Sequence, residues 1–291
     1  MQADIMLLMV TLFWGTSYFL IDVSLVSVDA LNLNALRFLI AFFLAMILCY
    51  KRMKPINKDT IKYALFLGII LTVVYISATY GVKYTSLSNA GFLSSLAVIF
   101  TPILIFIIKK QAPGKKLGVS IGLSLVGIAL LTLNNNLEPA FGDLLCIICA
   151  VFYALHIVTT EIAVKKNHID AFQVGVLQLG FTGLFNLILS FIIETPRFPD
   201  TIASWAAVLV LSIFCTGLAF IVQSVAQQYT NASHVGVILT LEPVFAGVVA
   251  YVFAGEVLLP RAYFGALLLV ISLLIMEINF PKKPMDKAAD T

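Results

Sequence analysis

The chain has 291 residues, of which 61% are hydrophobic and 11% charged, and its mean hydropathy is +1.03. A soluble domain is roughly 45–50% apolar and about 25% charged, so this composition excludes a soluble globular protein and indicates one embedded in lipid. The net charge of +3 does not indicate a nucleic-acid-binding surface, so no nucleic-acid partner is expected.

Ten apolar runs have about the 20 residues that a helix needs to cross the hydrocarbon core. The runs are continuous, whereas the strands of a membrane barrel alternate over about 10 residues, so we expect an all-α integral membrane protein with ten transmembrane helices. Short polar loops separate them, and the break at 225–231 is the weakest. The runs are residues 4–23, 31–50, 62–81, 87–108, 117–134, 143–162, 171–193, 203–225, 232–254 and 262–280.

The first two runs each carry one informative charge. Asp4 stands where a signal peptide has Lys or Arg, so we expect the first run to be retained as a span. Arg37 lies in the outer third of the second run. Its functional interpretation is a cationic site for a carboxylate or a gate ion pair. The alternatives are snorkelling to the headgroups and a structural pair with Asp22 or Asp29.

The sixth run places Cys146 and Cys149 one helical turn apart, and packing is favoured over a redox or metal site because free cysteines are usually buried. His156 lies in mid-span, where it either relays protons or is satisfied by a nearby hydroxyl or carbonyl. Glu161 and Lys165, four residues apart, are expected to form a surface pair of little energy. No metal site is predicted, since zinc-type Cys and His spacing is absent.

The ninth run contains Glu242 directly before Pro243. An ionisable side chain inside a span costs about 2.5–3.5 kcal/mol on insertion scales and therefore requires a partner or a wet cavity. Proline removes a backbone donor and kinks the helix, and Thr240 or Glu242 can bind the freed backbone groups. Glu242 is thus interpreted as part of a kink, as a proton carrier or gate, or as a substrate contact.

Lys and Arg distribute unevenly between alternate loops. With the N-terminus inside, 14 of the 18 basic residues fall in inside loops, and the remaining four are Arg37, Lys83, Arg197 and Arg261. Cytoplasmic loops carry such an excess, so we expect both termini to be cytoplasmic.

The two halves of the chain resemble each other. "YTSLSNAGFLSSLAVIF" (84–100) aligns with "YTNASHVGVILTLEPVF" (229–245) at a constant offset of 145, with Leu96 opposite Leu241. Five spans per repeat is an odd number, so the second repeat must be inverted in the membrane. Inverted repeats of transporters hold the substrate near the midplane between the halves.

Several motifs together resemble the EamA-type members of the drug/metabolite transporter superfamily. They are "FWGTS" (13–17), "LRF" (36–38), "NAGFL" (89–93) and "LEPVFAGVVAYVFAGE" (241–256). The resemblance implies a first five-helix repeat over 1–137, a second, inverted one over 138–281, and a cytoplasmic tail over 282–291. It also implies a central cavity lined by spans 1–4 and 6–9, with spans 5 and 10 peripheral, and a place in the inner membrane of a prokaryote.

Polar and aromatic residues on these spans are the candidate substrate contacts. An apolar chamber with a few polar groups suits a small amphipathic metabolite, although belt and packing roles are alternatives for single residues. The cavity candidates are Trp14, Tyr18, Arg37, Tyr75, Asn89, Ser95, Tyr153, His156, Gln178 and Gln223. The candidates for coupling or gating are Glu242, Pro243 and Pro102, the two prolines being expected to interrupt spans 4 and 9.

We expect a secondary transporter that moves a small metabolite by alternating access. The favoured substrate is an amino acid or a similar zwitterion or amine, and the favoured direction is export. Coupling of transport to protons is part of this hypothesis. No cofactor is expected. A channel or uniporter, and an importer of a small cationic or neutral nutrient, are the alternatives. With three dispersed histidines, a membrane enzyme is not expected.

Overall fold

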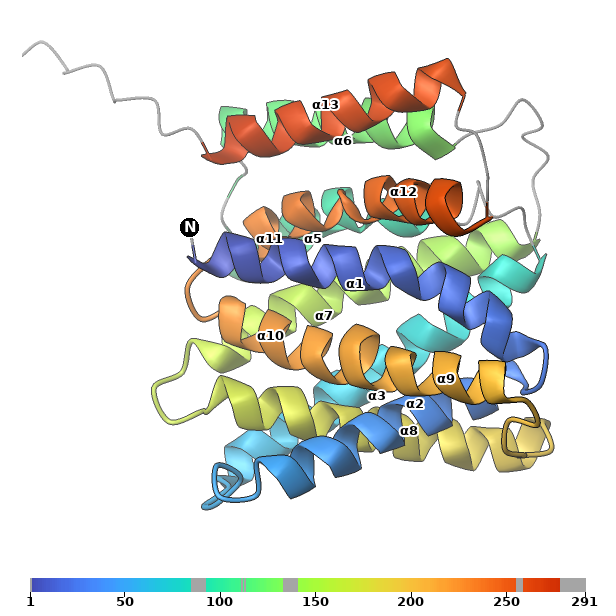
Figure 1. The fold of residues 1–291 in the computed structure, drawn as a ribbon. Helices are drawn as coiled ribbons and strands as arrows, with labels where there is room; N and C mark the ends of the chain where they lie inside the picture. Colours follow the sequence, from blue (N-terminus) through green and yellow to red (C-terminus); the bar gives the residue numbers. More distant parts are fainter. Residues whose placement is uncertain are drawn as a thin grey trace, which may run out of the picture.

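The computed structural model describes residues 2–84, 93–110, 112, 114–132, 141–254 and 259–277. All regular secondary structure within these residues is helical (Figure 1). The elements are α1 (Gln2–Leu25), α2 (Ala30–Leu48), α3 (Lys58–Tyr84), α5 (Ala97–Lys109), α6 (Lys115–Thr132), α7 (Phe141–Val164), α8 (Ala171–Ile193), α9 (Ile202–Val210), the π-helix η1 (Leu211–Leu218), α10 (Ala219–Ala226), α11 (Ala232–Leu239), α12 (Glu242–Ala254) and α13 (Pro260–Glu277).

These elements form ten spans in the described part of the chain. Seven helical stretches are long and apolar enough to cross a membrane, Leu93–Lys109 and Pro260–Ile275 are shorter apolar helices, and α6 has 18 residues. The segments α9, η1 and α10 continue one another, and only Thr240 and Leu241 separate α11 from α12. The prediction of an all-α membrane fold is confirmed.

Span boundaries agree with the sequence where polar turns bound the apolar run. The predicted span 171–193 coincides with α8, and 232–254 has the outer bounds of α11 and α12. Helix α3 begins earlier than predicted because its polar first turn extends the helix beyond the apolar run. Three of these helices begin at a side-chain cap: Asp170 accepts from Phe172 and Gln173, Thr201 from Ser204, and Asn231 from His234.

The helix contacts follow a pseudo-twofold pattern between the two halves. Helix α2 packs against its counterpart α8, and α6 packs against its counterpart α13. Helix α3 packs on α7, as the span α9–η1–α10 packs on α1. Figure 1 shows α1 running away from the end that carries the N-terminus, whereas α7 runs back toward it. The repeats are therefore inverted.

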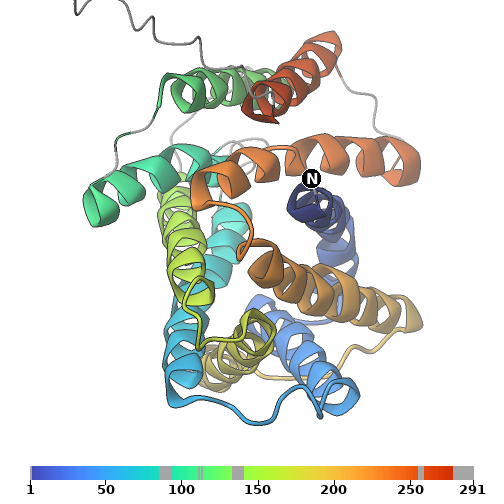
Figure 2. The same cartoon turned by 90° about the vertical axis from the view of Figure 1, so that its left-hand side faces the viewer.

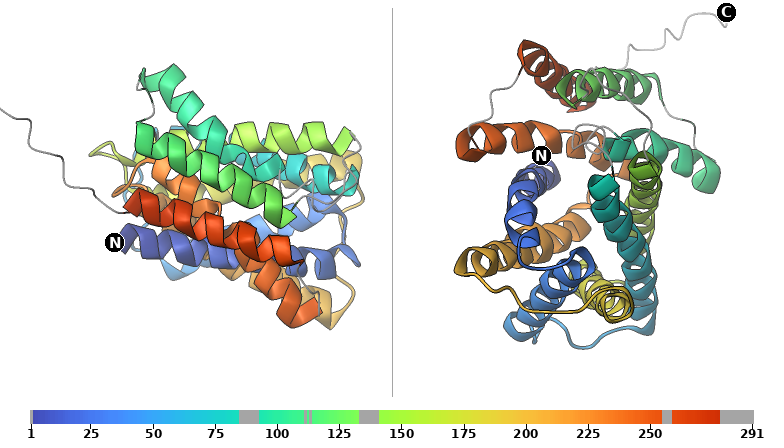
Figure 3. Two further views of the ribbon diagram at one scale, coloured as in Figure 1. Left: turned by 90° about the horizontal axis from the view of Figure 1, so that it is seen from above. Right: turned by 90° about the vertical axis from the view of Figure 1, so that its right-hand side faces the viewer.

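Helices α6 and α13 lie as a pair outside the other helices in Figures 2 and 3. Buried hydroxyls join them: Ser272 Oγ donates to the Ser120 carbonyl at 2.8 Å and lies 2.8 Å from Ser124 Oγ. Because lipid contains no water to bind these hydroxyls, they form hydrogen bonds with each other and with the backbone across the two helices. The main hydrophobic cluster lies instead among the other spans, from α1 to α11.

Three loops that carry basic residues turn at the end of the bundle that carries the N-terminus (Figure 1). The loops after α2, α5 and α7 all turn at this end. Their basic side chains are Lys51, Arg52, Lys54, Lys110, Lys165 and Lys166. The loop between α8 and α9 turns at the opposite end and carries Arg197 with Glu194 and Asp200.

Candidate functional site

Tyr18 of α1 connects the two halves of the chain. The Tyr18 side chain is 42% exposed, yet its hydroxyl donates to Glu242 Oε1 of α12 at 2.9 Å. Tyr75 of α3 and Cys149 of α7 also lie near Tyr18. Residues of α3, α7 and α12 therefore surround this side chain of α1.

Glu242 stands where the ninth span breaks. Helix α11 ends at Leu239, α12 begins at Glu242, and Pro243 is the second residue of α12. The Thr240 hydroxyl donates to the Val237 carbonyl at 2.6 Å, so it satisfies a backbone group at the break. A helix N-terminus carries partial positive charge, which stabilises a carboxylate there. The break therefore explains how an apolar span accommodates both Glu242 and Pro243.

Pro102 does not interrupt its helix, contrary to the sequence-based expectation. Helix α5 continues through Pro102 from Ala97 to Lys109, and the chain turns earlier, at Leu96. The repeat offset of 145 places Leu96 opposite Leu241, which lies in the break of the ninth span. The two halves thus break at equivalent positions, although their prolines are not equivalent.

Arg37 is a buried cation without an ion pair among the described side chains. It is 1% exposed, so it does not snorkel to the headgroups. Its Nε donates to Thr216 Oγ1 of η1 at 2.8 Å, and its guanidinium carbon lies 5.0 Å from the Tyr75 ring centre and 5.6 Å from that of Phe38. No described carboxylate lies within 4.0 Å of it. The two aromatic rings contribute cation–π attraction.

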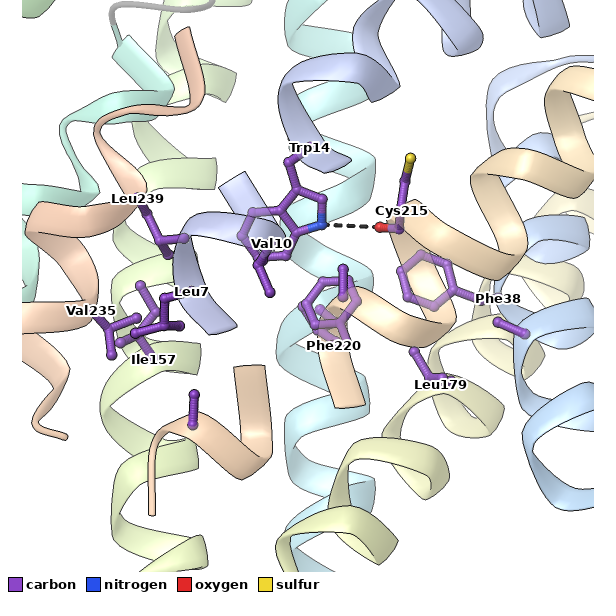
Figure 4. Packing of buried hydrophobic residues seen from close by; sticks show 14 of the residues in the cluster. Leu7, Val10, Trp14, Phe38, Ile157, Leu179, Cys215, Phe220, Val235 and Leu239 are labelled. Carbon is purple, nitrogen blue, oxygen red and sulfur yellow. Dashed lines mark hydrogen bonds between the residues drawn. The ribbon is translucent and has the colours of Figure 1, made fainter. Parts of the chain in front are cut away.

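Trp14 belongs to an aromatic cluster around Phe220. Its indole Nε1 donates to the Cys215 carbonyl at 3.0 Å, as Figure 4 shows. The ring of Phe220 lies 5.3 Å from Trp14 and 5.9 Å from Phe38, centre to centre. The Tyr153 ring meets Trp14 edge-on at 5.8 Å. The indole thus joins the first half of the chain to the eighth span.

His156 is held by a carbonyl oxygen, that of the Gln178 side-chain amide, which is one of the two arrangements expected for it. Its Nε2 lies 2.9 Å from Gln178 Oε1, and Gln178 Nε2 donates to Ser224 Oγ at 3.2 Å. An amide oxygen only accepts, so Nε2 carries the proton in this arrangement. The chain of bonds connects α7, α8 and α10, and all three side chains are buried.

Several buried polar atoms near these hydrogen bonds have no partner among the described residues. The Gln223 side chain lies beside the Tyr153 hydroxyl. Neither the Tyr153 Oη nor the amide atoms of Gln223 form a hydrogen bond of normal geometry, and His156 Nδ1 is also unpartnered. Leaving such a group unsatisfied costs about 1–3 kcal/mol, so these groups are candidates for contacts made only in another state or with a ligand.

Glu161 is not the surface residue that its position predicts. Its side chain is 4% exposed and lies 2.9 Å from Lys109 Nζ and 2.7 Å from Lys165 Nζ. Its Oε2 also accepts from the backbone N–H of Ala232, which begins α11, at 3.2 Å. The correction has a physical cause: packing of α5 and α11 over the end of α7 covers the carboxylate. Nearby, His234 Nε2 lies 2.9 Å from Asp4 Oδ1.

The structure places most, but not all, of the predicted cavity residues together. Asn89 lies outside the described residues, and Ser95 is half-buried at the start of the fourth span. Sequence reasoning missed Cys149, Thr216 and Phe220 as neighbours of the site. For Phe220 a signal existed, because it precedes Gln223 by three residues and so shares its helix face.

The inverted repeats and the interior polar groups define a multi-pass helical membrane protein of the transporter class. A family model described as the EamA-like transporter family matches residues 1–133 and 140–278. The chain belongs to this family, which confirms the resemblance to EamA-type members of the drug/metabolite transporter superfamily.

Individual proteins agree with this membership, and a solved structure has the same fold. An uncharacterized transporter of Archaeoglobus fulgidus is 29% identical over 283 residues, covering 96% of this chain and 87% of that protein. The uncharacterized transporter YoaV of Bacillus subtilis is 24% identical over 286 residues, covering 94% of this chain and 96% of YoaV. A crystal structure of a protein with 16% sequence identity has a TM-score of 0.82, covers 95% of this chain and 96% of its own, and shares the fold.

Proposed function

We propose that the protein is a secondary active transporter for small zwitterions that carry a carboxylate and an ammonium group, such as a neutral amino acid. The observation that carries this proposal is a buried Arg37 that has no ion pair among the described side chains and that lies, like the acid Glu242, near Tyr75. The Arg37 guanidinium carbon is 5.0 Å from the Tyr75 ring centre. Separated charges of opposite sign match the two ends of a zwitterion.

The Arg37 guanidinium is the proposed contact for the substrate carboxylate. No described residue accepts a hydrogen bond from its two terminal nitrogens. An arginine fork binds a carboxylate through two parallel hydrogen bonds, which adds both strength and orientation. A substrate carboxylate would also neutralise a charge whose burial is otherwise expensive.

Glu242 is the proposed contact for the ammonium group and the proposed coupling residue. Glu242 is half-buried within the ninth span, where its carboxylate binds either a proton or a substrate ammonium, so the two compete for the same oxygen atoms. Such competition amounts to proton antiport. Where the cell drives protons inward, antiport exports the substrate, which is the direction that we propose.

Alternating access would use the equivalent breaks at Leu96 and Leu241. Both breaks lie in spans that border the interior, and inverted repeats commonly exchange conformations around a fixed central site. The excess of basic residues at the N-terminal end of the bundle supports cytoplasmic termini. We propose the prokaryotic inner membrane as the location.

Counterflow into proteoliposomes tests the proposal. Vesicles are loaded with an unlabelled neutral amino acid, and uptake of the labelled compound is compared with that of its amide, which lacks the carboxylate, and its deaminated acid, which lacks the ammonium group. Saturable counterflow of the amino acid, at least about tenfold better than with either analogue, is expected from loss of one charged contact. Equal handling of all three contradicts the proposal, and non-saturating flux without counterflow favours a channel.

A further inference from the structure

The eighth span contains a π-helix, η1, between α9 and α10. A π-helix is bonded from residue i to i+5 and is rare, and its short insertions into α-helices often mark functional sites. Here the wide turn lies next to two helices of the first half, α1 and α2. The question is what the irregular turn does for those helices.

Two side chains of the first half bond to consecutive residues of η1. Trp14 of α1 donates to the Cys215 carbonyl at 3.0 Å, and Arg37 of α2 donates to Thr216 Oγ1 at 2.8 Å. Trp14 is 6% exposed, and Arg37, Cys215 and Thr216 are at most 1% exposed. Both bonds are thus protected from water, and η1 presents a backbone acceptor and a side-chain acceptor to the other half of the protein.

The approach of η1 to α2 depends on a glycine. A Cβ added at Gly217 would lie 3.3 Å from the Ala41 Cβ and 3.1 Å from the Ser212 carbonyl oxygen. Ala41 lies four residues after Arg37, so both share one face of α2. The absence of a side chain at Gly217 therefore permits the close contact in which Thr216 reaches Arg37.

Thr216 holds the guanidinium group at the edge that carries Nε. An arginine has five N–H groups in one plane and no acceptor. Thr216 Oγ1 accepts a hydrogen bond from Arg37 Nε. The ring centres of Tyr75 and Phe38 lie 5.0 and 5.6 Å from the guanidinium carbon. The remaining edge, with Nη1 and Nη2, has no acceptor among the described residues. It is the edge that forms the end-on fork for a carboxylate.

We propose that Thr216 is a positioning residue for substrate carboxylate recognition, holding Arg37 so that its terminal nitrogens form the binding fork. This inference rests on the proposed function, because it concerns the same carboxylate. Thr216 itself does not contact the substrate. Loss of the Thr216 hydroxyl leaves the guanidinium group buried but free to rotate. The affinity for substrates that carry a carboxylate then falls.

The experiment compares Thr216→Val, which keeps the shape and removes the acceptor, with Thr216→Ser, which keeps the acceptor. For each protein, counterflow gives the KM of a neutral amino acid and of its amide. Thr216→Val should raise the KM of the amino acid roughly tenfold, the value for a lost hydrogen bond to a charged group, and leave that of the amide within about twofold. Thr216→Ser should behave as the wild type.

A matched control lies in the same π-helix. Ser212 is equally buried, but its hydroxyl donates to the Val208 carbonyl and not to Arg37. Ser212→Ala should leave the ratio of the two KM values unchanged. Thermal unfolding of all variants in detergent shows whether η1 itself is disturbed.

Two results overturn the inference. One is an unchanged amino-acid KM in Thr216→Val, and the other is an equal rise of both KM values, which denotes a merely structural role. Failure of the proposed function is distinguishable, because the wild type itself would then not prefer the amino acid over its amide. That result removes the carboxylate site and with it this role of Thr216.

Discussion

The Tyr18 hydroxyl donates a hydrogen bond to Glu242 across 2.9 Å, although the two residues are 224 positions apart. The bond joins α1 of the first half to α12 of the second, at the point where the ninth span breaks. Any motion that separates these helices must break it. The interaction therefore connects the deepest acid of the chain with the seam between its halves.

Glu242→Gln tests proton competition at this acid. Ammonium binding requires the ionised carboxylate, so the wild-type KM for a zwitterion should fall as pH rises and Glu242 loses its proton. Glutamine cannot titrate but still accepts from Tyr18. We expect a KM raised roughly tenfold and independent of pH, because a charged contact is replaced by a neutral one. Counterflow kinetics from mildly acidic to mildly alkaline pH measure this.

Tyr18→Phe is the matched control, since it removes the bond and leaves the acid. Its KM should remain dependent on pH, because the titrating acid is retained. A Glu242→Gln protein with the wild-type pH profile would leave Glu242 with a structural role in the helix break only.

The spans could be predicted from the sequence because lipid imposes a length and a hydropathy on each of them. Helix α8 begins at a capping Asp170 and ends before the polar run that starts at Glu194, so its bounds agreed with the prediction. Pro102 shows where local rules fail. Proline lacks a backbone donor wherever it stands, but α5 continues through Pro102 and the chain turns at Leu96 instead.

The site could be predicted only in outline. Arg37, Tyr75 and Glu242 stand out because they are polar in apolar runs, whereas Thr216 and Phe220 are unremarkable in a sequence and matter only through what packs against them. The prediction that Glu161 lies at the surface was wrong, because burial at a helix end depends on neighbouring helices. Periodicity along one helix carries no information on those neighbours.

Gly15→Ala should destabilise the contact between α1 and α12. A Cβ at this position would lie 2.6 Å from the Phe245 Cβ and 2.8 Å from the Ala246 backbone nitrogen, so the helices must separate. Overpacking of this kind costs about 1–3 kcal/mol. Thermal unfolding in detergent should show a lower midpoint. Gly122→Ala is the control, because nothing lies within 4 Å there and the helix should be unchanged or slightly stabilised.

Glu161→Gln should weaken the N-terminal end of the bundle. The substitution keeps an acceptor for Ala232 but removes the charge that faces Lys109 and Lys165. Hydrogen bonds to charged groups contribute about 1.5–3 kcal/mol, so a measurable loss in the free energy of unfolding is expected. Asp59→Asn provides the comparison. Its partners Lys62 and His168 are 78% and 50% exposed, and such surface pairs contribute about 0–1 kcal/mol. Equal effects of both substitutions would contradict the importance of burial.

Gln223→Leu should separate stability from transport. The Gln223 amide is 1% exposed and forms no hydrogen bond of normal geometry with the described residues, so replacing it with an apolar side chain of similar size removes a penalty of about 1–3 kcal/mol. We expect an unchanged or higher unfolding midpoint together with slower counterflow, because the amide is retained for a contact made with substrate or in another conformation.

Gln227 offers the matched comparison one helical turn away. It is equally buried, but its Nε2 donates to the Ile157 carbonyl at 2.9 Å, so Gln227→Leu should lower the unfolding midpoint. Unfolding and counterflow measured on the same preparations show whether the Gln223 amide serves stability or transport. If Gln223→Leu loses stability as Gln227→Leu does, the amide is paired in the native state. If its counterflow equals that of the wild type, Gln223 has no part in transport, and the polar groups of the site reduce to Arg37, Glu242 and their direct neighbours.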